Sequence, residues 1–597
     1  MRQRYTKSTL TNFLFRKRIL LITILLVFVV IFAGISWNNF FTAHSKWVPK
    51  EGGIFTDSVV GKIKNISPLS QENSLLDLDL RQLIFAGLLQ YNPTTSVIED
   101  GLATLRVSEN GKTYFLTLKN SAKFSNGEVV SVADILFTYE EVVQNPGFAN
   151  DALKNAFEYI TLDVIDKNTV AFNLPEPNTY FSSLLATPIL RKKSYENALI
   201  EEINDPEYPA NKHPISAGPY ILKNIIQDER GLSRVFLERN EHYFAGKPFI
   251  KQLVFYVYST FDYLKDDNHW TTMYSHLSTY KVEKIEPNLY GEYSSREYVL
   301  PRFMGIFFNL DNTLTSNPHL REALKLSVDK DAILSKEKGW NRIDSVFFFE
   351  GVEGWQGEDY STARSLLRDK GFKYNKKEEI RIFQEDPVKL KMITSTSPAV
   401  YSRLAQNIAR IWEKELDIIV ELEVLNPAKF QESLQKRDYD LVFFGQNFSE
   451  NSDALSSWHS SQSGKLNLAN LTHPDVDFLI EEVRFTGALS DLLTLNQKLS
   501  EINPIIAIAT PKYHLLVAHD LLGFSKNFGK IRKHAERFFG IEEWYFEQQR
   551  DWDLAKHQSK FAEYFSWLFS DKDNSKLDYR EIIPQELLEK TDEKQTK

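Results

Sequence analysis

The strongest pattern in the chain is a long apolar run near its start. Residues 19–37 contain only two hydroxyl side chains, Thr23 and Ser36, and no charged residue. A helix of this length rises about 28 Å, close to the roughly 30 Å hydrocarbon thickness of a bilayer. The pattern therefore predicts one transmembrane helix over 19–37.

Charge around this run predicts its orientation. Residues 1–18 carry six basic side chains and no acidic one, which places them in the cytoplasm and the rest of the chain outside. A cleaved signal peptide is the alternative, but its apolar region usually spans about 7–15 residues before a small-x-small site. Here the apolar run is longer. The one plausible cleavage site, which ends at Ala43, has Phe41 where a small residue is needed. We expect an uncleaved anchor in the cell membrane, a short stalk over 38–50 and a large extracytoplasmic region.

Alternating and helical patterns are most regular in residues 387–444. Apolar positions alternate over 388–392 and 418–424, recur at helical spacing over 404–412, and dominate 439–444. With a short helix before the last strand, the order is β-α-β-α-β, typical of a parallel sheet with crossover helices. This order predicts an α/β fold class.

Two helix starts are also marked by their sequence. Ser131 and Asp134 have the spacing of a capping box, in which each side chain pairs with the backbone of the other residue. Asn317 followed by Pro318 has the form of an N-cap and a first-turn proline. We expect helices to begin at both places.

Length and composition bound the remaining possibilities. The 597 residues predict several compact units, and the absence of cysteine excludes disulfides, Cys-ligated metals and thiol catalysis. The net charge is −9, and it becomes −15 once residues 1–18 are set aside. This balance argues against nucleic acid as a partner, since phosphate binding needs a basic face. Residues 551–597 are expected to form a charged, solvated tail.

No motif for catalysis is present. The chain contains no HExxH, Walker A, GxSxG or strand-associated GxGxxG sequence. His269 and His276 lie seven residues apart, but two surface histidines explain this spacing better than a metal pair. We expect no enzyme activity, no cofactor and no metal, which leaves binding as the main function.

A series of short motifs follows in order between residues 52 and 545. The series comprises Val59-Val-Gly61, Asn65-Ile-Ser-Pro68-Leu69, Ser108-Glu-Asn-Gly111, Lys123-Phe124-Ser-Asn-Gly127, Ala217-Gly218-Pro219-Tyr220, Glu238-Arg239-Asn240, Arg321-Glu-Ala323-Leu324, Val328-Asp329-Lys330 and Thr472-His-Pro474. In this order they resemble the dipeptide- and oligopeptide-binding family, the family 5 solute-binding proteins of peptide ABC importers. Ser216-Ala217 replaces the usual Gly-Thr before the Gly-Pro-Tyr turn.

The resemblance implies a two-lobed periplasmic-binding-protein-like fold with an extra inserted domain. We expect a discontinuous lobe I over 50–75, 185–300 and 512–550, the extra domain over 76–184, and lobe II over 301–511. The ligand is expected between lobes that close about a hinge.

The same resemblance implies where the ligand binds. In relatives, a carboxylate after the strand that ends near Phe444 receives the peptide's α-amino group. The candidate ligand-binding residues are Val59, Val60, Gly61, Gly445, Gln446, Asn447, Ser449, Glu450, Asp453 and Trp458. The aligned position, Ser449 or Asn447, is not acidic here. Glu450 or Asp453 is expected to replace it, with Asp453 favoured; alternatively, Asp453 only begins the helix that carries Trp458.

The resulting functional hypothesis is a membrane-tethered receptor that captures oligopeptides and delivers them to the permease subunits of an ABC importer. A monomer is expected. The alternatives are another solute, such as a nickel chelate, haem or an oligosaccharide, or a tethered binding protein that acts as a sensor or chaperone rather than in transport.

Overall fold

A computed structural model describes residues 4–71, 74–227, 232–259, 277–281, 293–337, 339–347, 358–447, 453–524 and 531–551. The chain forms two compact units. One comprises residues 1–50 with 547–597, and the other comprises residues 51–546. Each unit is described by itself.

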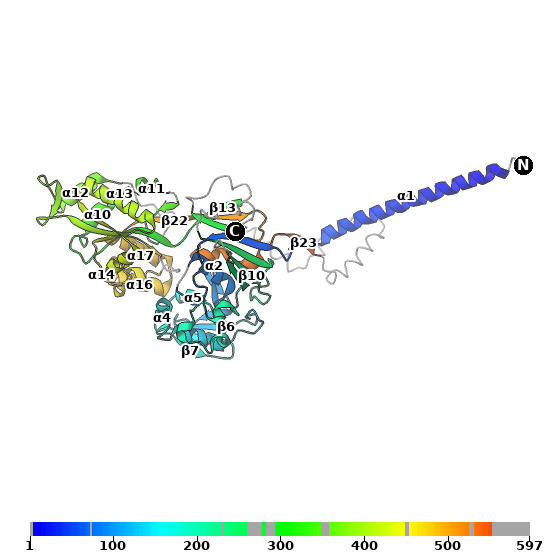
Figure 1. Cartoon of the computed structure of the whole chain (residues 1–597), viewed down its shortest axis with the longest axis horizontal. Coiled ribbons are helices and arrows are strands. Elements are labelled where there is room, and N and C mark those ends of the chain that lie inside the picture. The colour runs from blue at the N-terminus through cyan, green and yellow to red at the C-terminus, as the bar shows by residue number, and fades with distance from the viewer. Residues whose placement is uncertain are drawn as a thin grey trace, which may run out of the picture. The chain divides into compact units, whose positions relative to one another are not determined.

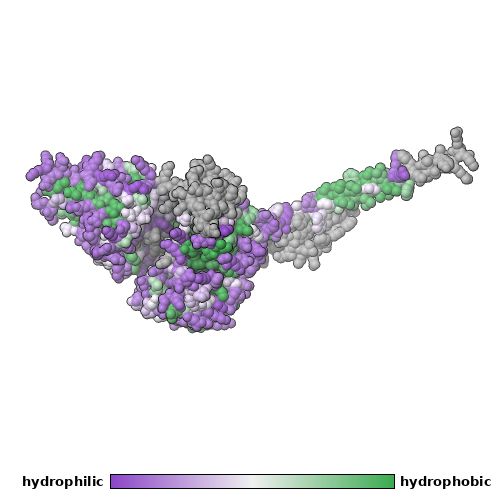
Figure 2. Space-filling model, viewed as in Figure 1, coloured by the Kyte–Doolittle hydropathy of each residue, from purple (hydrophilic) through white to green (hydrophobic). Residues whose placement is uncertain are grey.

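The described residues of the first unit, 4–50 and 547–551, form one long helix and a two-stranded ribbon. Helix α1 (Arg4–His44) includes the apolar window Phe15–Phe40, whose hydrophobic surface is visible in Figure 2. Its length and composition suit a membrane span, and a signal sequence passes the same test. Strand β1 (Lys46–Pro49) follows and pairs antiparallel with β23 (Gln548–Asp551). The expected stalk, 38–50, is therefore the end of α1 followed by a paired strand.

Side chains along the ribbon connect its two strands and the end of α1. Lys50 Nζ lies 2.5 Å from Glu547 Oε2, and the Arg550 guanidinium lies over the Trp47 ring, 4.8 Å from its centroid. Arg550 also donates hydrogen bonds to the Thr42 carbonyl and the Ser45 hydroxyl. The ribbon thus joins residues from both ends of the chain.

In the second unit, lobe I is built on a four-stranded sheet. Its strand order is β2 (Ile54–Val60), β11 (Gln252–Tyr258), β10 (Ser233–Arg239) and β9 (Tyr220–Gln227). Strand β2 runs parallel to β11, and the other pairs are antiparallel. Helix α2 (Leu75–Ile84) begins at a Ser74–Asp77 capping box and packs its apolar side on this sheet. The short helices η6 (His534–Phe538) and η7 (Ile541–Glu543) complete the lobe.

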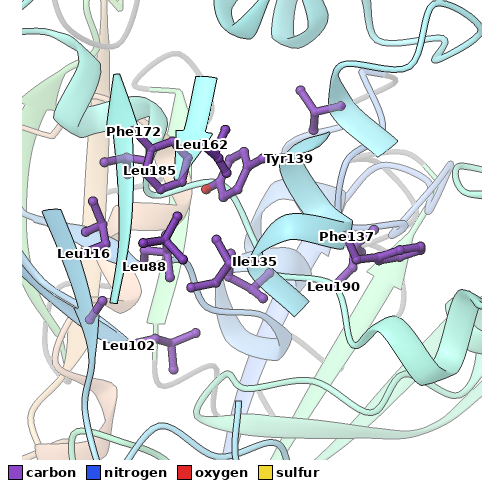
Figure 3. Close-up of a cluster of buried hydrophobic side chains, with 14 of the residues drawn as sticks. Leu88, Leu102, Leu116, Ile135, Phe137, Tyr139, Leu162, Phe172, Leu185 and Leu190 are labelled. Carbon is purple, nitrogen blue, oxygen red and sulfur yellow. The ribbon is translucent and has the colours of Figure 1, made fainter. Parts of the chain in front are cut away.

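The extra domain is an independent α+β core. It contains the hairpin β3 (Leu89–Asn92) and β4 (Val97–Asp100), and a sheet ordered β5 (Ala103–Val107), β6 (Thr113–Leu118), β8 (Thr169–Asn173) and β7 (Thr161–Val164). Its helices are α3 (Val132–Leu136), the π-helix η1 (Phe137–Val143), α4 (Asp151–Phe157), α5 (Phe181–Leu184), α6 (Lys192–Tyr195), η2 (Ile200–Glu202) and α7 (Pro209–Lys212). Figure 3 shows Leu116 and Phe172 of the sheet beside Ile135 and Tyr139 of the helical segment. The predicted Ser131–Asp134 capping box is present.

Two segments near the limits expected for the extra domain, 76–184, differ in the core that they join. Residues 76–84 belong to α2, whose Leu80 and Leu83 are buried in the core of lobe I. Conversely, Leu185, Leu190 and Tyr195 are buried in the core of the extra domain. Burial of apolar side chains, which drives packing, therefore groups α2 with lobe I, and Leu185, Leu190 and Tyr195 with the extra domain.

Lobe II contains the predicted β-α-β-α-β unit. Its elements are β19 (Lys389–Ser395), α13 (Ala399–Leu416), β20 (Ile419–Leu425), α14 (Pro427–Lys436) and β21 (Leu441–Asn447). Strand β19 runs parallel to both β20 and β21, and β14 (Arg302–Phe308) pairs antiparallel with β21. A small sheet joins β16 (Lys373–Asn375), β17 (Ile380–Phe383) and β18 (Asp386–Pro387). The predicted α/β fold class is confirmed.

Helices cover both faces of the lobe II sheet (Figure 1). One face carries α10 (Pro318–Leu326), α11 (Lys330–Leu334), α12 (Tyr360–Asp369) and α13, and the other carries α14, α15 (Leu455–Trp458), η5 (Ser460–Gln462), α16 (Pro474–Thr486) and α17 (Leu489–Ile502). The Asn317 side chain accepts hydrogen bonds from the first turn of α10, as its N-cap pattern predicts.

One long strand runs through both lobes. Residues 505–509 of β22 (Ile505–Ala518) pair with β14 of lobe II, whereas residues 512–518 pair with β13 (Tyr293–Val299). Strands β12 (Leu277–Lys281) and β15 (Trp340–Arg342) also pair with β22. At the crossing, the Thr510 hydroxyl donates to the Arg302 carbonyl at 2.7 Å. The chain also crosses between the lobes at residues 300–301, from β13 to β14, so two neighbouring segments connect the lobes covalently.

Candidate ligand-binding site

The first part of the candidate site is the outer edge of lobe I. Val59 and Val60 pair in parallel register with β11, and the Gly61 N–H donates to the Tyr258 carbonyl at 2.9 Å. Among the described strands, β2 pairs only with β11, and Val60 is 41% exposed. Peptide groups of a strand point alternately to its two sides. An edge strand in this position suits pairing with an extended ligand backbone.

The second part is the end of β21 in lobe II. Strand β14 pairs with the whole of β21, but β19 pairs only with Leu441–Phe443. The last residues of β21, from Phe444 through Gln446 to Asn447, therefore have no strand on that side within the described part of the chain. The hydroxyl of Tyr401 occupies the position that a Cβ at Gly445 would take. Glycine is required here because the ring lies against its backbone.

Asp453 combines two roles in the structure. Its Oδ1 accepts a hydrogen bond from the Leu455 N–H at 3.0 Å, at the start of α15. Its Oδ2 lies 3.4 Å from Arg484 Nε, with the Asp453 side chain 22% exposed and the Arg484 side chain 29% exposed. Asp453 therefore lies just before the N-cap of α15, accepts a hydrogen bond from the first helical residue, and also faces an arginine while retaining contact with water. Ser449 and Glu450 lie outside the described residues.

Trp458 lies in the core of lobe II. Its side chain is fully buried and stacks on Phe307, with ring centroids 6.1 Å apart. This packing positions α15 and, through it, Asp453. Direct contact of Trp458 with a ligand stays a prediction.

Tyr180 is a residue of this region that the sequence patterns do not reveal. It lies in the extra domain, yet it packs against the core of lobe II. Burial raises the pKa of the Tyr180 hydroxyl to about 12; the negative charge of Asp453 adds to the shift and Arg484 opposes it. A single tyrosine in a loop has no periodicity, so only its tertiary contacts place it beside Asp453.

A charged cluster lies beneath β2. Arg537 Nη2 is 2.8 Å from Asp57 Oδ2 on β2, and Arg537 Nη1 is 2.8 Å from Asp79 Oδ2 on α2. All three side chains are essentially inaccessible to water. Burial raises the pKa of Asp79 to about 7, opposed by the charge of Arg537 and reinforced by that of Asp57. The cluster ties the candidate edge strand to α2 and η6.

His534 extends this cluster toward the strands that join the lobes. Its Nε2 lies 3.8 Å from Asp79 Oδ2, and its Nδ1 lies 2.9 Å from the Tyr298 hydroxyl. Burial, and then the charge of Arg537, lower the pKa of His534 well below its usual value. Tyr298 of β13 in turn stacks on Tyr513 of β22 at 5.4 Å.

Within the described residues, no group of three or more His, Asp or Glu side chains is arranged to hold a metal ion. His269 and His276 lie outside those residues. The described site therefore consists of two strand edges and a carboxylate–arginine pair, an arrangement suited to binding an extended polar molecule.

Comparison with known proteins identifies the family. Residues 97–466 match the model of the bacterial extracellular solute-binding proteins, family 5. The chain belongs to this family. Its members are named as binding proteins, so a family 5 chain of this kind is a receptor rather than an enzyme. Members are extracellular or periplasmic.

Individual relatives cover most of the chain. The oligopeptide-binding protein AppA of Bacillus subtilis is 21% identical over 551 residues, covering 87% of this chain and 97% of that protein. The periplasmic oligopeptide-binding protein OppA of Salmonella typhimurium is 23% identical and covers 64% of this family 5 chain and 73% of its own length.

Solved structures show the same fold. AppA of Bacillus subtilis in complex with a nonapeptide matches with a TM-score of 0.64 and 18% identity, over 84% of this chain and all of that one. NikZ of Campylobacter jejuni in complex with Ni(L-His) matches with a TM-score of 0.63 and 20% identity, over 83% of this chain and all of that one. The two-lobed architecture is therefore shared by binding proteins for different solutes.

Proposed function

We propose that this family 5 protein captures oligopeptides outside the cell membrane and delivers them to the permease subunits of an ABC importer. The observation that carries the proposal is a pair of strand edges, one on each lobe: β2 at Val59–Gly61 and the end of β21 at Gly445–Asn447. Relatives named as oligopeptide-binding proteins, including one solved with a nonapeptide, support it.

Backbone pairing explains how such a site binds many sequences. A peptide removed from water needs partners for its N–H and C=O groups. Strand edges supply these partners with little dependence on side chains. Because a ligand shifts the equilibrium only toward the form that it binds better, a peptide paired with both edges favours closed lobes.

Membrane attachment forms part of the proposal. Helix α1 has the length and apolarity to serve as an uncleaved anchor, and the chain has no cysteine for a lipid anchor. Sequencing the N-terminal peptide of membrane-extracted protein tests this, with residues 1–37 expected to be present. A mature N-terminus at or after residue 38 would contradict the anchor but leave the ligand proposal intact.

The ligand itself is tested by identifying what co-purifies with the protein. The protein is washed, denatured and its released small molecules are analysed by mass spectrometry. A mixture of oligopeptides is the expected result. Recovery of one nickel chelate, haem or an oligosaccharide in stoichiometric amount, without peptides, would contradict the peptide proposal.

A further inference from the structure

A loop of the extra domain is hydrogen-bonded to the end of a lobe II helix. The Thr179 N–H and hydroxyl both donate to the Arg484 carbonyl, at 2.9 and 3.0 Å. Arg484 lies in the last turn of α16, where carbonyl groups lack partners within the helix. A loop of the extra domain therefore supplies hydrogen-bond donors to a carbonyl group at the end of a lobe II helix.

Gly487 permits this close approach. It ends α16 with a φ of +64°, a conformation that glycine adopts without penalty. A Cβ at this position would lie 3.2 Å from the Thr179 hydroxyl oxygen and 3.4 Å from its Cβ. A side chain at 487 would thus press directly on the loop.

Tyr180 extends the same contact beside Asp453 and Arg484. Its ring packs against the lobe II core, and its N–H donates to the Asn178 side chain at 3.1 Å. The Asn178 carbonyl accepts from the Tyr114 hydroxyl at 2.8 Å, and the next residue, Phe181, is buried in the extra domain. The loop is therefore fixed to its own domain while it contacts lobe II.

We propose that Thr179 and Tyr180 form a latch that holds the extra domain against lobe II and stabilises the closed arrangement of the lobes without ligand. The β22 crossing is covalent and persists whether the lobes are open or closed. The latch exists only when the extra domain and lobe II meet. A ligand that favours the same arrangement binds with higher apparent affinity when the latch is intact, because more of the free protein is already competent.

The test measures the separation of the two parts in the full chain, without ligand. Because the chain has no cysteine, two introduced cysteines, E176C and E481C, carry spin labels at defined places. Glu176 and Glu481 have side-chain exposures of 82% and 67%, and they lie on the extra domain and lobe II respectively. Their distance distribution is recorded by electron spin resonance in detergent-solubilised protein.

Gly487→Ala is compared with Gly464→Ala in this labelled background. Gly464 also has a positive φ, +74°, but nothing lies within 4 Å of its Cβ position, so it controls for backbone strain. We expect Gly487→Ala to raise the ratio of long to short distances by up to about tenfold, because a methyl group 3.2 Å from the Thr179 hydroxyl oxygen displaces the loop and weakens its two hydrogen bonds. Gly464→Ala should leave the distribution unchanged. Equal distributions in the two variants would overturn the latch.

A second pair of variants keeps the test valid if Gly487→Ala folds poorly. Thr179→Val removes one hydroxyl donor and preserves shape, so a smaller rise in the long-distance population is expected. Thr104→Val is its control, because that hydroxyl bonds the Thr117 carbonyl within the extra domain. If Thr179→Val and Thr104→Val give the same distribution, the Thr179 hydroxyl contributes nothing and the proposed latch is wrong.

Discussion

Two arginine–carboxylate groups in the second unit differ in their access to water. In lobe I, Arg537 contacts Asp57 and Asp79 at 2.8 Å, and no member is more than 1% exposed. In lobe II, Arg484 and Asp453 are 3.4 Å apart and about a quarter exposed. A fully buried charge that loses its partner is left without compensation, whereas a partly exposed charge can still be solvated by water. The first group is suited to holding structure and the second to exchanging partners with a ligand.

The largest expected effect comes from Arg537→Met. It leaves the Asp57 carboxylate buried without its counter-charge and removes the partner of Asp79, so the free energy of unfolding should fall by about 3–5 kcal/mol. Urea unfolding of the full chain, followed by tryptophan fluorescence, measures the change. The same substitution at Arg484 is the matched control and should cost about 1 kcal/mol or less. Equal losses for both variants would remove the distinction between the two groups.

The buried group should also give stability a pH dependence. The folded pKa of Asp79, about 7, lies above its ordinary value of 3.8, so the folded protein retains a proton that the unfolded chain has lost. Stability should therefore decrease as pH rises through this window, with a slope of at most about 1.4 kcal/mol per pH unit. Asp79→Asn should flatten this part of the profile of unfolding free energy against pH. An unchanged slope in the variant would assign the effect to other groups.

Asp453→Asn tests partner exchange in the partly exposed pair of Asp453 and Arg484. If Asp453 receives a peptide's α-amino group, the variant should bind free-amine peptides more weakly by about 1.5–3 kcal/mol, the scale of a charge-assisted hydrogen bond. N-acetylated versions of the same peptides should be little affected. Calorimetric titration of both peptide forms into wild type and variant provides the measurement. Equal losses for the two forms, or no loss for either, would leave Asp453 as a helix-start residue only.

The smallest effect is expected for Asp453→Asn on folding itself. The Asp453–Arg484 pair and the Asp453–Leu455 hydrogen bond are both only partly buried, and ion pairs that remain in contact with water contribute about 1 kcal/mol or less. Thermal unfolding without ligand, compared with wild type, checks this. A loss as large as that of Arg537→Met would show that the Asp453 group is structural too.

The sequence predicts the interior of lobe II better than its connections. The β-α-β-α-β unit of residues 387–444 is predictable because each element carries its own apolar period. The helix start at Asn317 is equally local. The domain limits are harder to predict from sequence. Helix α2 belongs to lobe I because residues such as Leu80 are buried in its core, and no local sequence pattern indicates this burial.

In the candidate site, too, some features are predictable from the sequence and others depend on tertiary contacts. The β2 edge and the end of β21 follow from strand patterns and the family resemblance. The structure shows that Asp453 lies at a helix start and also faces Arg484, a pairing across 31 positions that no local rule gives. The sequence does not predict the roles of Arg537 and Tyr180. No local pattern indicates where an isolated arginine or an isolated aromatic residue is buried. Ligand contact by the candidate residues stays a prediction.

The ribbon of β1 and β23 has a consequence for biosynthesis. Lys46 opposes Asp551, so one strand leaves the ribosome about 500 residues before its partner, a delay of roughly 25–100 s at ordinary rates of synthesis. During that time β1 is an unpaired strand, and unpaired edges invite association with other chains. The ribbon can close only after residue 551 has been made, so it forms after residues 51–546 of the second unit have been synthesised.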